Sequence, residues 1–307
     1  MQCSKIAAYS ITSSATKDFF CPPCYPSNTH LFCTLEAVLM SQRHELETRL
    51  KGATLVRKGL MRKHEGILPL RLIPDLNVIK IGGHGIVDYG RDVVLPLLEE
   101  IGELSKQHKI LVVTGGGVRV RHIMDIGIDL GMPTGVLAEL ASKISEQNAV
   151  MVSLLLSRWG GSRVKTSDLL DLPTLFHLGL LPVIHGTPPY GLYEHPPEFG
   201  LIPPHRTDTG AFLMAELLGA KNCILVKDVD GLFDEDPRLN PRARLIEEIG
   251  AEGLIGMHME DLVLERKTVE LLQHAANVRK IKIINGHKRG TIEQALTEEK
   301  VGTIIKA

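Results

Sequence analysis

The sequence predicts an α/β fold, a three-layer sandwich with a mainly parallel central sheet, and two observations carry this prediction. Short apolar runs rich in β-branched residues alternate with longer segments whose apolar residues share one helical face. Glycine-rich turns follow several of the short runs directly. Strand, glycine turn and helix in repeated order indicate βαβ units, in which helices cover a parallel sheet. Ligands of such folds bind beyond the C-terminal ends of the strands, where these turns fall.

The individual elements follow this alternation along the chain. A short strand is predicted over 77–81, and a helix over 92–104, where apolar residues recur with the helical period. A second strand over 109–114 ends in three glycines and leads into a helix over 118–130. Further along we expect helices over 141–158 and 209–218, strands over 181–185, 223–227, 281–284 and 303–305, and loops over 187–204 and 232–242.

Length and composition limit the class of protein. The 307 residues are enough to bury a large core, and a 44% hydrophobic and 23% charged composition is ordinary for a soluble globular protein. A net charge of −1 provides no basic field for nucleic acid, and no apolar run is long enough to span a membrane. We therefore expect a cytoplasmic protein that binds neither nucleic acid nor membrane.

The chain divides into three predicted regions. Residues 1–39 are rich in Ser, Thr, Pro and Cys and show no sustained apolar period, which predicts a disordered extension or an artefact of start-site choice. Residues 40–70 are predicted to form an N-terminal helical arm, because 41–63 is charged and helix-prone. Residues 71–307 carry the glycine motifs and are predicted to be the nucleotide-binding domain.

The glycine-and-charge motifs predict a nucleotide site. Lys80 ends a strand and enters the turn Gly82-Gly83; a solvated surface lysine is the ordinary alternative, but a lysine at a glycine turn is suited to a polyphosphate. Lys227 ends another strand and is a second candidate phosphate ligand. Asp208 is suited to cap the helix after it, and also to hold Lys80 or order a magnesium-bound water. The predicted site comprises the catalytic candidates Lys80 and Asp208 and the nucleotide-binding candidates Gly82, Gly83, Lys227, Asp230, Gly231, Phe233, Asp236 and Pro237.

A second anion site is predicted at the turn Gly115-Gly116-Gly117, between a strand and a helix. These glycines are compatible with a simple tight turn, but their N–H groups and the helix dipole also suit an oxyanion. Arg119 and Arg121 follow in the first helical turns. Because residues two apart face different sides of a helix, we expect at most one of these arginines to point at the anion.

Four histidines fall within a short window: His177, His185, His195 and His205. A single histidine is more often structural than a ligand, but four together favour a shared role. Imidazole nitrogen can bind a transition metal, and imidazolium can pair with an anionic oxide cluster. The spacing is not that of a zinc site, where two close pairs are expected.

The motifs together resemble the amino acid kinase superfamily, over about residues 71–307. The stretch 227–237 is similar to its nucleotide-site segment, and Asn285-Gly286 with 289–291 and 300–305 is similar to the ending of its uridylate kinase branch. A narrower resemblance, carried by 116–122, 146–148, 188–190 and above all 202–213, is to the molybdenum storage protein family. Two positions depart from the expected pattern: Gly116 replaces an alanine, and His84 follows Gly82-Gly83.

This resemblance implies a fold, ligands and an assembly. It implies an amino acid kinase-like domain that binds ATP and Mg²⁺, and a cage of related subunits, by resemblance a hexamer, that packs polyoxomolybdate. In that family His177 looks like a cluster-binding histidine. ATP hydrolysis would then accompany the loading of molybdate.

Two other functions stay open at this level. One is a nucleoside monophosphate kinase of the uridylate type, in which positioning and charge neutralisation bring about phosphoryl transfer. His205 and Arg206 stand directly before Thr207-Asp208, where uridylate kinases carry small hydroxyl residues, which disfavours ordinary uridylate specificity. The other is a non-catalytic nucleotide-binding partner subunit, which would have no need of Lys80, Asp208 and Lys227 together.

Overall fold

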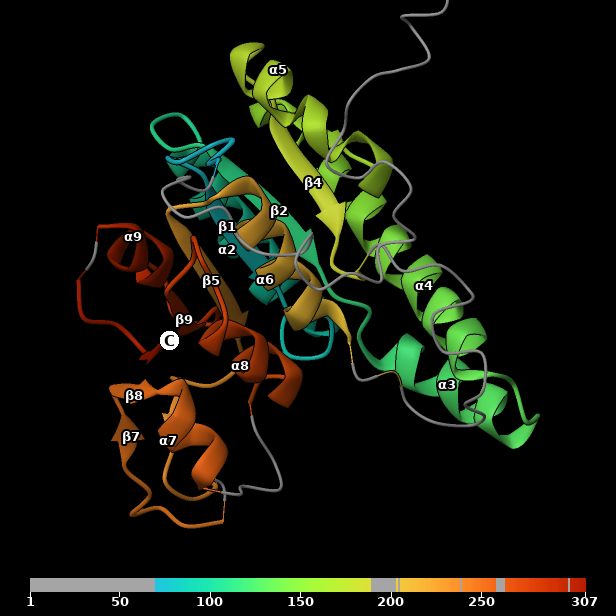
Figure 1. The fold of residues 1–307 in the computed structure, drawn as a ribbon. Helices are drawn as coiled ribbons and strands as arrows, with labels where there is room; N and C mark the ends of the chain where they lie inside the picture. Colours follow the sequence, from blue (N-terminus) through green and yellow to red (C-terminus); the bar gives the residue numbers. More distant parts are fainter. Residues whose placement is uncertain (1–69, 189–202, 204, 238, 258–262, 298) are drawn as a thin grey trace, which may run out of the picture. The chain divides into compact units, whose positions relative to one another are not determined.

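The computed structural model describes residues 70–307 except 189–202, 204, 238, 258–262 and 298 (Figure 1). The chain divides into two units, and the described residues all lie in the second, Leu68–Ala307. The predictions for residues 1–39 and for nearly all of the arm at 40–70 therefore lie outside the described residues. No helix in the described part of the chain has the length and apolar character needed to cross a membrane.

The middle layer is a β-sheet. The strands are β1 Asn77–Ile81, β2 Ile110–Thr114, β3 Gly161–Arg163, β4 Leu181–His185, β5 Asn222–Lys227, β6 Leu232–Phe233, β7 Leu245–Ile246, β8 Glu248–Gly250, β9 Lys280–Asn285 and β10 Thr303–Lys306. Among the described residues, eight strands form one sheet in the order β3-β4-β2-β1-β5-β9-β10-β8, and β6 pairs separately with β7. Within the eight-stranded sheet, neighbouring strands run parallel except β10 against β9, which confirms the mainly parallel sheet.

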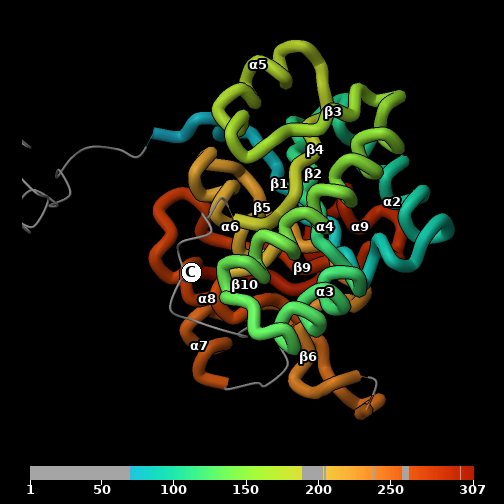
Figure 2. Tube along the Cα trace, turned by 90° about the vertical axis from the view of Figure 1, so that its right-hand side faces the viewer, coloured from blue at the N-terminus to red at the C-terminus, as the bar shows by residue number. Residues whose placement is uncertain are grey.

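Helices cover both faces of this sheet (Figures 1 and 2). The α-helices described are α2 Arg91–Leu104, α3 Val118–Asp129, α4 Thr134–Leu155, α5 Leu172–His177, α6 Thr207–Leu218, α7 Ala251–Gly256, α8 Arg266–Gln273 and α9 Thr291–Leu296, with 3-10 turns η2 Val87–Tyr89, η3 Ser157–Trp159 and η4 Thr166–Asp171. Helices α5, α6, α7 and α8 share one apolar core with the sheet, and α2, α4 and α9 share the other. The three-layer prediction is thereby confirmed.

The alternation of side chains along each strand divides them between these two cores. In β1, Val78 belongs to the α6 core and Ile79 to the α2 core, and in β5 Leu225 and Ile224 divide in the same way. Successive strand residues point to opposite faces, so residues two apart share a face. Lys80 and Lys227 therefore extend from the sheet on the side that α6 covers.

The boundaries and several short elements differ from the sequence prediction. The helix predicted over 141–158 begins at Thr134, and the loop predicted over 232–242 opens with the short strand β6. Helices α5, α7, α8 and α9 were not anticipated, because six to eight residues hardly span two helical turns and give little periodic signal. Tertiary packing forms them instead: Val269 and Leu272 of α8 are fully buried in the α6 core.

Candidate functional site

A cavity of about 1100 Å³ opens at the C-terminal ends of β1 and β5. The chain passes from β1 to β2 on one side and returns to β5 on the other, so the order of strands reverses at β1. Such a reversal leaves a crevice in which ligands of open α/β sheets bind. Thirteen of the predicted site residues line this cavity: Lys80, Gly82, Gly83, Gly116, Gly117, Arg121, His205, Asp208, Lys227, Gly231, Phe233, Asp236 and Pro237.

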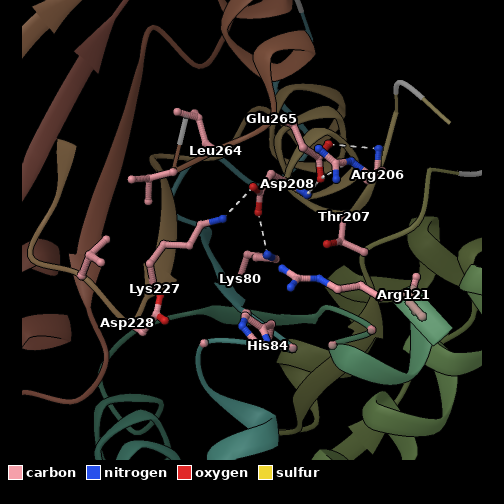
Figure 3. A pocket seen from close by; sticks show the side chains of 18 of the residues that line it. Lys80, His84, Arg121, Arg206, Thr207, Asp208, Lys227, Asp228, Leu264 and Glu265 are labelled. Atoms are coloured by element: carbon pink, nitrogen blue, oxygen red, sulfur yellow. Dashed lines mark hydrogen bonds and ion pairs between the residues drawn. The ribbon is translucent and has the colours of Figure 1, made fainter. Parts of the chain in front are cut away.

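Two lysines meet one carboxylate at the centre of the cavity (Figure 3). Lys80 Nζ lies 2.6 Å from Asp208 Oδ1, and Lys227 Nζ donates to Asp208 Oδ2 at 2.7 Å. The side chains of Lys80 and Asp208 are each 5% exposed and that of Lys227 is 13% exposed. Because the two lysines come from neighbouring strands, the parallel register of β1 and β5 brings them to the same edge.

Burial and neighbouring charges shift the pKa values of Asp208 and Lys227 in this cluster. Burial alone would raise the pKa of Asp208, but Lys227 and Lys80 outweigh it and hold that pKa well below its usual range. Burial lowers the pKa of Lys227; Asp208 opposes that effect, and Lys80 adds to it. Each ammonium group has three N–H donors and pairs with one oxygen of Asp208, so phosphate oxygens could accept from the remaining donors.

Asp208 does not cap its helix, so that part of the prediction is wrong. Helix α6 begins at Thr207 with Arg206 at the N-cap position and no side-chain cap bond. Glu265 closes this helix end instead. Its carboxylate accepts the backbone N–H groups of Arg206, Asp208 and Thr209 at 2.9–3.0 Å and the Thr209 hydroxyl at 2.6 Å. Asp208 is thus left free to bind the lysines.

Glu265 is a site residue that the sequence did not reveal. It is 7% exposed and lines the cavity beside Asp208. It lies 56 residues from Thr209 along the chain, and no local motif connects the two. Its carboxylate charge also raises the pKa of Lys227, against the larger effect of burial. The role of Glu265 at the start of α6 depends on how α8 packs against α6, which the sequence alone does not indicate.

The second predicted anion site adjoins the turn that follows β1. The turns at Gly83 and Gly117 are in direct contact, since a Cβ added to Gly83 would lie 2.0 Å from Gly117 N. Gly117 has a φ of 76° and precedes α3. Asp88 of η2 accepts the Val118 N–H at 2.6 Å, so one N–H of this helix end is already bound. Gly116 and Gly117 line the cavity, and Gly115 is not among its lining residues.

Only one of the two predicted arginines faces the cavity. Arg121 lines it, whereas Arg119 turns toward α4, where it donates to Gln147 Oε1 at 3.3 Å and to Asn148 Oδ1. This division agrees with the expectation that residues two apart in a helix point to different sides. Figure 3 shows Arg121 extending toward Lys80 across the cavity.

Asp230 occupies a different position from the rest of the nucleotide motif. It is not among the residues lining the cavity; it accepts from Asn285 Nδ2 at 2.9 Å and pairs with Lys288 Nζ at 2.6 Å. Hydrogen bonds from Lys288 and Asn285 lower the pKa of Asp230. Asp230 therefore joins the loop after β5 to the end of β9, rather than facing the ligand space.

The structure does not bring the predicted histidines together in one chain. His205 lines the cavity. His185 ends β4 opposite Thr114 of β2, and burial, followed by the nearby Lys143 and Arg163, lowers its pKa. His177 ends α5 before β4 begins, so it lies at the opposite edge of the sheet from His185. His195 lies outside the described residues, and within the described ones no group of three or more His, Cys, Asp or Glu could hold a metal ion.

Comparisons with known proteins agree with this geometry. The model of the amino acid kinase family matches residues 75–285, more than half of the chain. The molybdenum storage protein subunit beta of Azotobacter vinelandii is 40% identical over 263 residues, which cover 86% of this chain and 97% of that protein. A uridylate kinase of Thermofilum pendens is 30% identical over 76% of this chain and 98% of its own length. The solved uridylate kinase of Archaeoglobus fulgidus superposes with a TM-score of 0.60 at 21% identity, covering 75% of this chain and 99% of that one.

Proposed function

Because this chain belongs to the amino acid kinase family, we propose that it binds Mg-ATP between Lys80, Asp208 and Lys227 and acts as a storage subunit for molybdenum oxyanions. The observation that carries the ATP site is the pair of lysines sharing one buried carboxylate at the strand ends. Phosphate oxygens would accept hydrogen bonds from the remaining N–H donors of these two lysines. The molybdenum cargo is proposed from the storage-protein relative, whose similarity covers nearly its full length.

The two ends of ATP fall on different parts of the cavity in this proposal. Its phosphates lie against Lys80, Lys227 and the Gly82-Gly83 turn, and its adenine lies among Leu232, Phe233 and Pro237 of the loop after β5. Hydrolysis then transfers the γ-phosphoryl group in line to water, favoured by positioning and by charge neutralisation from the two lysines. Polyoxomolybdate accumulates within the assembly as this proceeds.

Magnesium fits this site through phosphate and water. Both oxygens of Asp208 contact lysine ammonium groups, so that carboxylate is not free to bind a metal ion directly. Asp228 and Asp236 are further carboxylates of the cavity wall within reach of a hydrated ion. Mg²⁺ usually keeps several waters and binds through substrate phosphates with one or two carboxylates. When bound, it would neutralise phosphate charge.

An oligomer with a related subunit is part of the proposal. The name of the storage-protein relative, subunit beta, indicates such a partner for that protein. In this chain α4 exposes Val150, Met151, Leu154 and Leu155, four neighbouring apolar residues near its C-terminal end. Apolar residues gathered on one exposed face are typical of surfaces that another protein covers. A cytoplasmic hexamer is the assembly proposed.

A second function, phosphoryl transfer to an organic monophosphate such as a nucleotide, is favoured by one observation. Beyond Gly117 the cavity wall includes apolar residues beside Arg121, Asp125 and Ser145; they are Val120, Met124 and Ile128 of α3 and Ala138 and Ala141 of α4. An inorganic oxyanion has no use for an apolar wall, whereas the body of an organic phosphate would pack on it. The two functions place the same second anion at the same glycine turn.

The deciding experiment is elemental analysis of the purified full chain after incubation with molybdate, Mg²⁺ and ATP and subsequent desalting. Retention of many molybdenum atoms per chain, dependent on ATP, is the expected result. Absence of molybdenum together with transfer of phosphate to a nucleoside monophosphate would replace storage by the kinase function.

Lys80→Ala tests the nucleotide site in the same preparation. We expect this variant to lose ATP binding, measured by calorimetry, because it removes one of the two phosphate-binding charges. Lys306→Ala is the matched control, since Lys306 is an exposed lysine at the end of β10 and is not among the residues lining the cavity. Unchanged ATP affinity in Lys80→Ala would contradict the site.

A further inference from the structure

The turn after β1 presents a single side chain to the cavity, and it is an imidazole. The turn reads Gly82-Gly83-His84-Gly85. Neither neighbour of His84 has room for a side chain, because a Cβ on Gly83 would lie 2.0 Å from Gly117 N and one on Gly85 would lie 2.7 Å from Asp228 Oδ1. His84 itself is 53% exposed and lines the cavity.

The position of His84 is opposite the lysine pair. Figure 3 draws its ring across the ligand space from Asp208, near Lys80 and Arg121, and all of these residues line the same cavity. The contact between Gly83 and Gly117 places His84 beside the turn proposed to bind the second oxyanion. An oxyanion at that turn would therefore lie within reach of the imidazole.

A carboxylate faces this ring. His84 Nδ1 lies 3.9 Å from Asp88 Oδ2, and Asp88 is itself fixed by the Val118 N–H at 2.6 Å. Histidines that bind metals usually turn one ring nitrogen toward a carboxylate or carbonyl group, which directs the other nitrogen to the metal. Asp88 lies on the Nδ1 side of the ring, beyond hydrogen-bond distance, so Nε2 is the nitrogen considered for a ligand.

We propose that His84 Nε2 binds molybdenum when an oxomolybdate occupies the turn at Gly116 and Gly117, an inference that rests on the proposed storage function. Molybdenum can take up a nitrogen donor in addition to its oxo groups, whereas the phosphorus of a bound phosphate cannot do so without changing bonds. His84 thus selects molybdate over phosphate at a site whose lysines, arginine and glycine amides accept either tetrahedral dianion.

This assignment differs from the histidine cluster expected from sequence. His177 lies at the opposite edge of the sheet, and His185 is not among the residues lining the cavity. His84 adjoins the proposed ATP phosphates, so it is placed to meet each oxomolybdate as it is loaded. The ligand class of the site is consequently a tetrahedral oxyanion of a transition metal.

The test compares His84→Gln with wild type in the full chain. Glutamine keeps the polarity and approximate length of the side chain but lacks the imidazole donor. His122→Gln is the matched control, because His122 is an exposed histidine of α3 that is not among the lining residues. Molybdate and inorganic phosphate affinities are measured with ATP bound, and nitrogen scattering at the molybdenum edge is measured by X-ray absorption.

We expect His84→Gln to weaken molybdate binding about tenfold or more, to leave phosphate and ATP affinities unchanged, and to remove the nitrogen contribution from the absorption spectrum. Equal weakening of molybdate and phosphate, or a nitrogen contribution that persists in the variant, would overturn the ligand role of His84 while storage stands. A wild-type protein that takes up no molybdate would overturn storage, and the inference with it.

Discussion

The N-termini of α6 and α3 face the same cavity, and a distant carboxylate caps each of them in a different way. At α6, Glu265 is 7% exposed and accepts three backbone N–H groups and a hydroxyl. At α3, Asp88 is 24% exposed and accepts one N–H. The first helix end is closed by the fold, whereas the second is only partly occupied.

This difference assigns the two helix ends to different tasks. A free helix N-terminus attracts anions because its N–H groups and dipole are positive. Glu265 already binds the N–H groups at the start of α6, so they are not available to an anion. It also fixes the backbone of Asp208, whose side chain pairs with both lysines. Asp88 leaves Gly116 and Gly117 open to the cavity. A second anion is thus expected at α3 and not at α6.

The largest expected effect is on stability, from Glu265→Ala. Removing this carboxylate leaves the buried N–H groups of Asp208 and Thr209 and the part-buried N–H of Arg206 without an acceptor, so we expect the free energy of unfolding to fall by about 3 kcal/mol or more. Glu265→Gln, which keeps one carbonyl acceptor, should lose less. Urea denaturation of both variants measures the difference, and a loss below about 1 kcal/mol for Glu265→Ala would mean that the α6 end is not closed as described.

The next expected effect is a pH-dependent change in stability that comes from the charge of Asp208. The pKa of Asp208 is lowered in the folded protein, so its charge stabilises the fold above the unfolded value of about 4, and this contribution is lost as pH falls below it. The stability difference between wild type and Asp208→Asn should therefore shrink as pH falls from about 5 to about 3. A difference that stayed constant over that range would contradict the ion pairs.

At α3, Asp88→Asn should change ligand selection more than stability. The asparagine oxygen can still accept the Val118 N–H, so only the favourable charge at the helix end is lost, about 0.3–1 kcal/mol. Affinity for inorganic phosphate should rise because a negative charge beside the turn is gone. The preference for molybdate over phosphate should fall, because His84 loses the carboxylate that faces its Nδ1. Binding titrations with both anions measure this. An unchanged ratio of molybdate to phosphate affinity would mean that Asp88 does not act through His84.

The smallest effect distinguishes the two arginines of α3. Arg121→Gln should weaken oxyanion binding several-fold, since it removes a cavity charge, whereas Arg119→Gln should leave binding nearly unchanged. The same titrations compare them, and Arg119→Gln serves as the control. Equal effects would mean that the helix end, and not its side chains, governs the anion.

Much of the fold and part of the site could be predicted because their signals are local. The strands that carry Lys80 and Lys227 are continuous apolar runs, and the glycine turns follow them directly. Glu265 and Asp88 gave no such signal, because each acts on a helix that begins far from it in sequence. The Asp208 cap was predicted wrongly for the same reason: local preference favoured a cap, and a distant carboxylate had already taken its place.

The contact between Gly83 and Gly117 has a consequence for how such proteins diverge. Backbone packs against backbone here, with no side chain between, and this contact sets the spacing between the turn after β1 and the turn before α3. The distance between the two proposed ligands is then fixed by this backbone contact, and we expect substitutions elsewhere to leave it unchanged. Side chains that line the cavity, such as His84 and Arg121, can differ without changing this distance. The same fold could in this way bind an inorganic oxyanion in place of an organic acceptor while the spacing of the two turns stays the same.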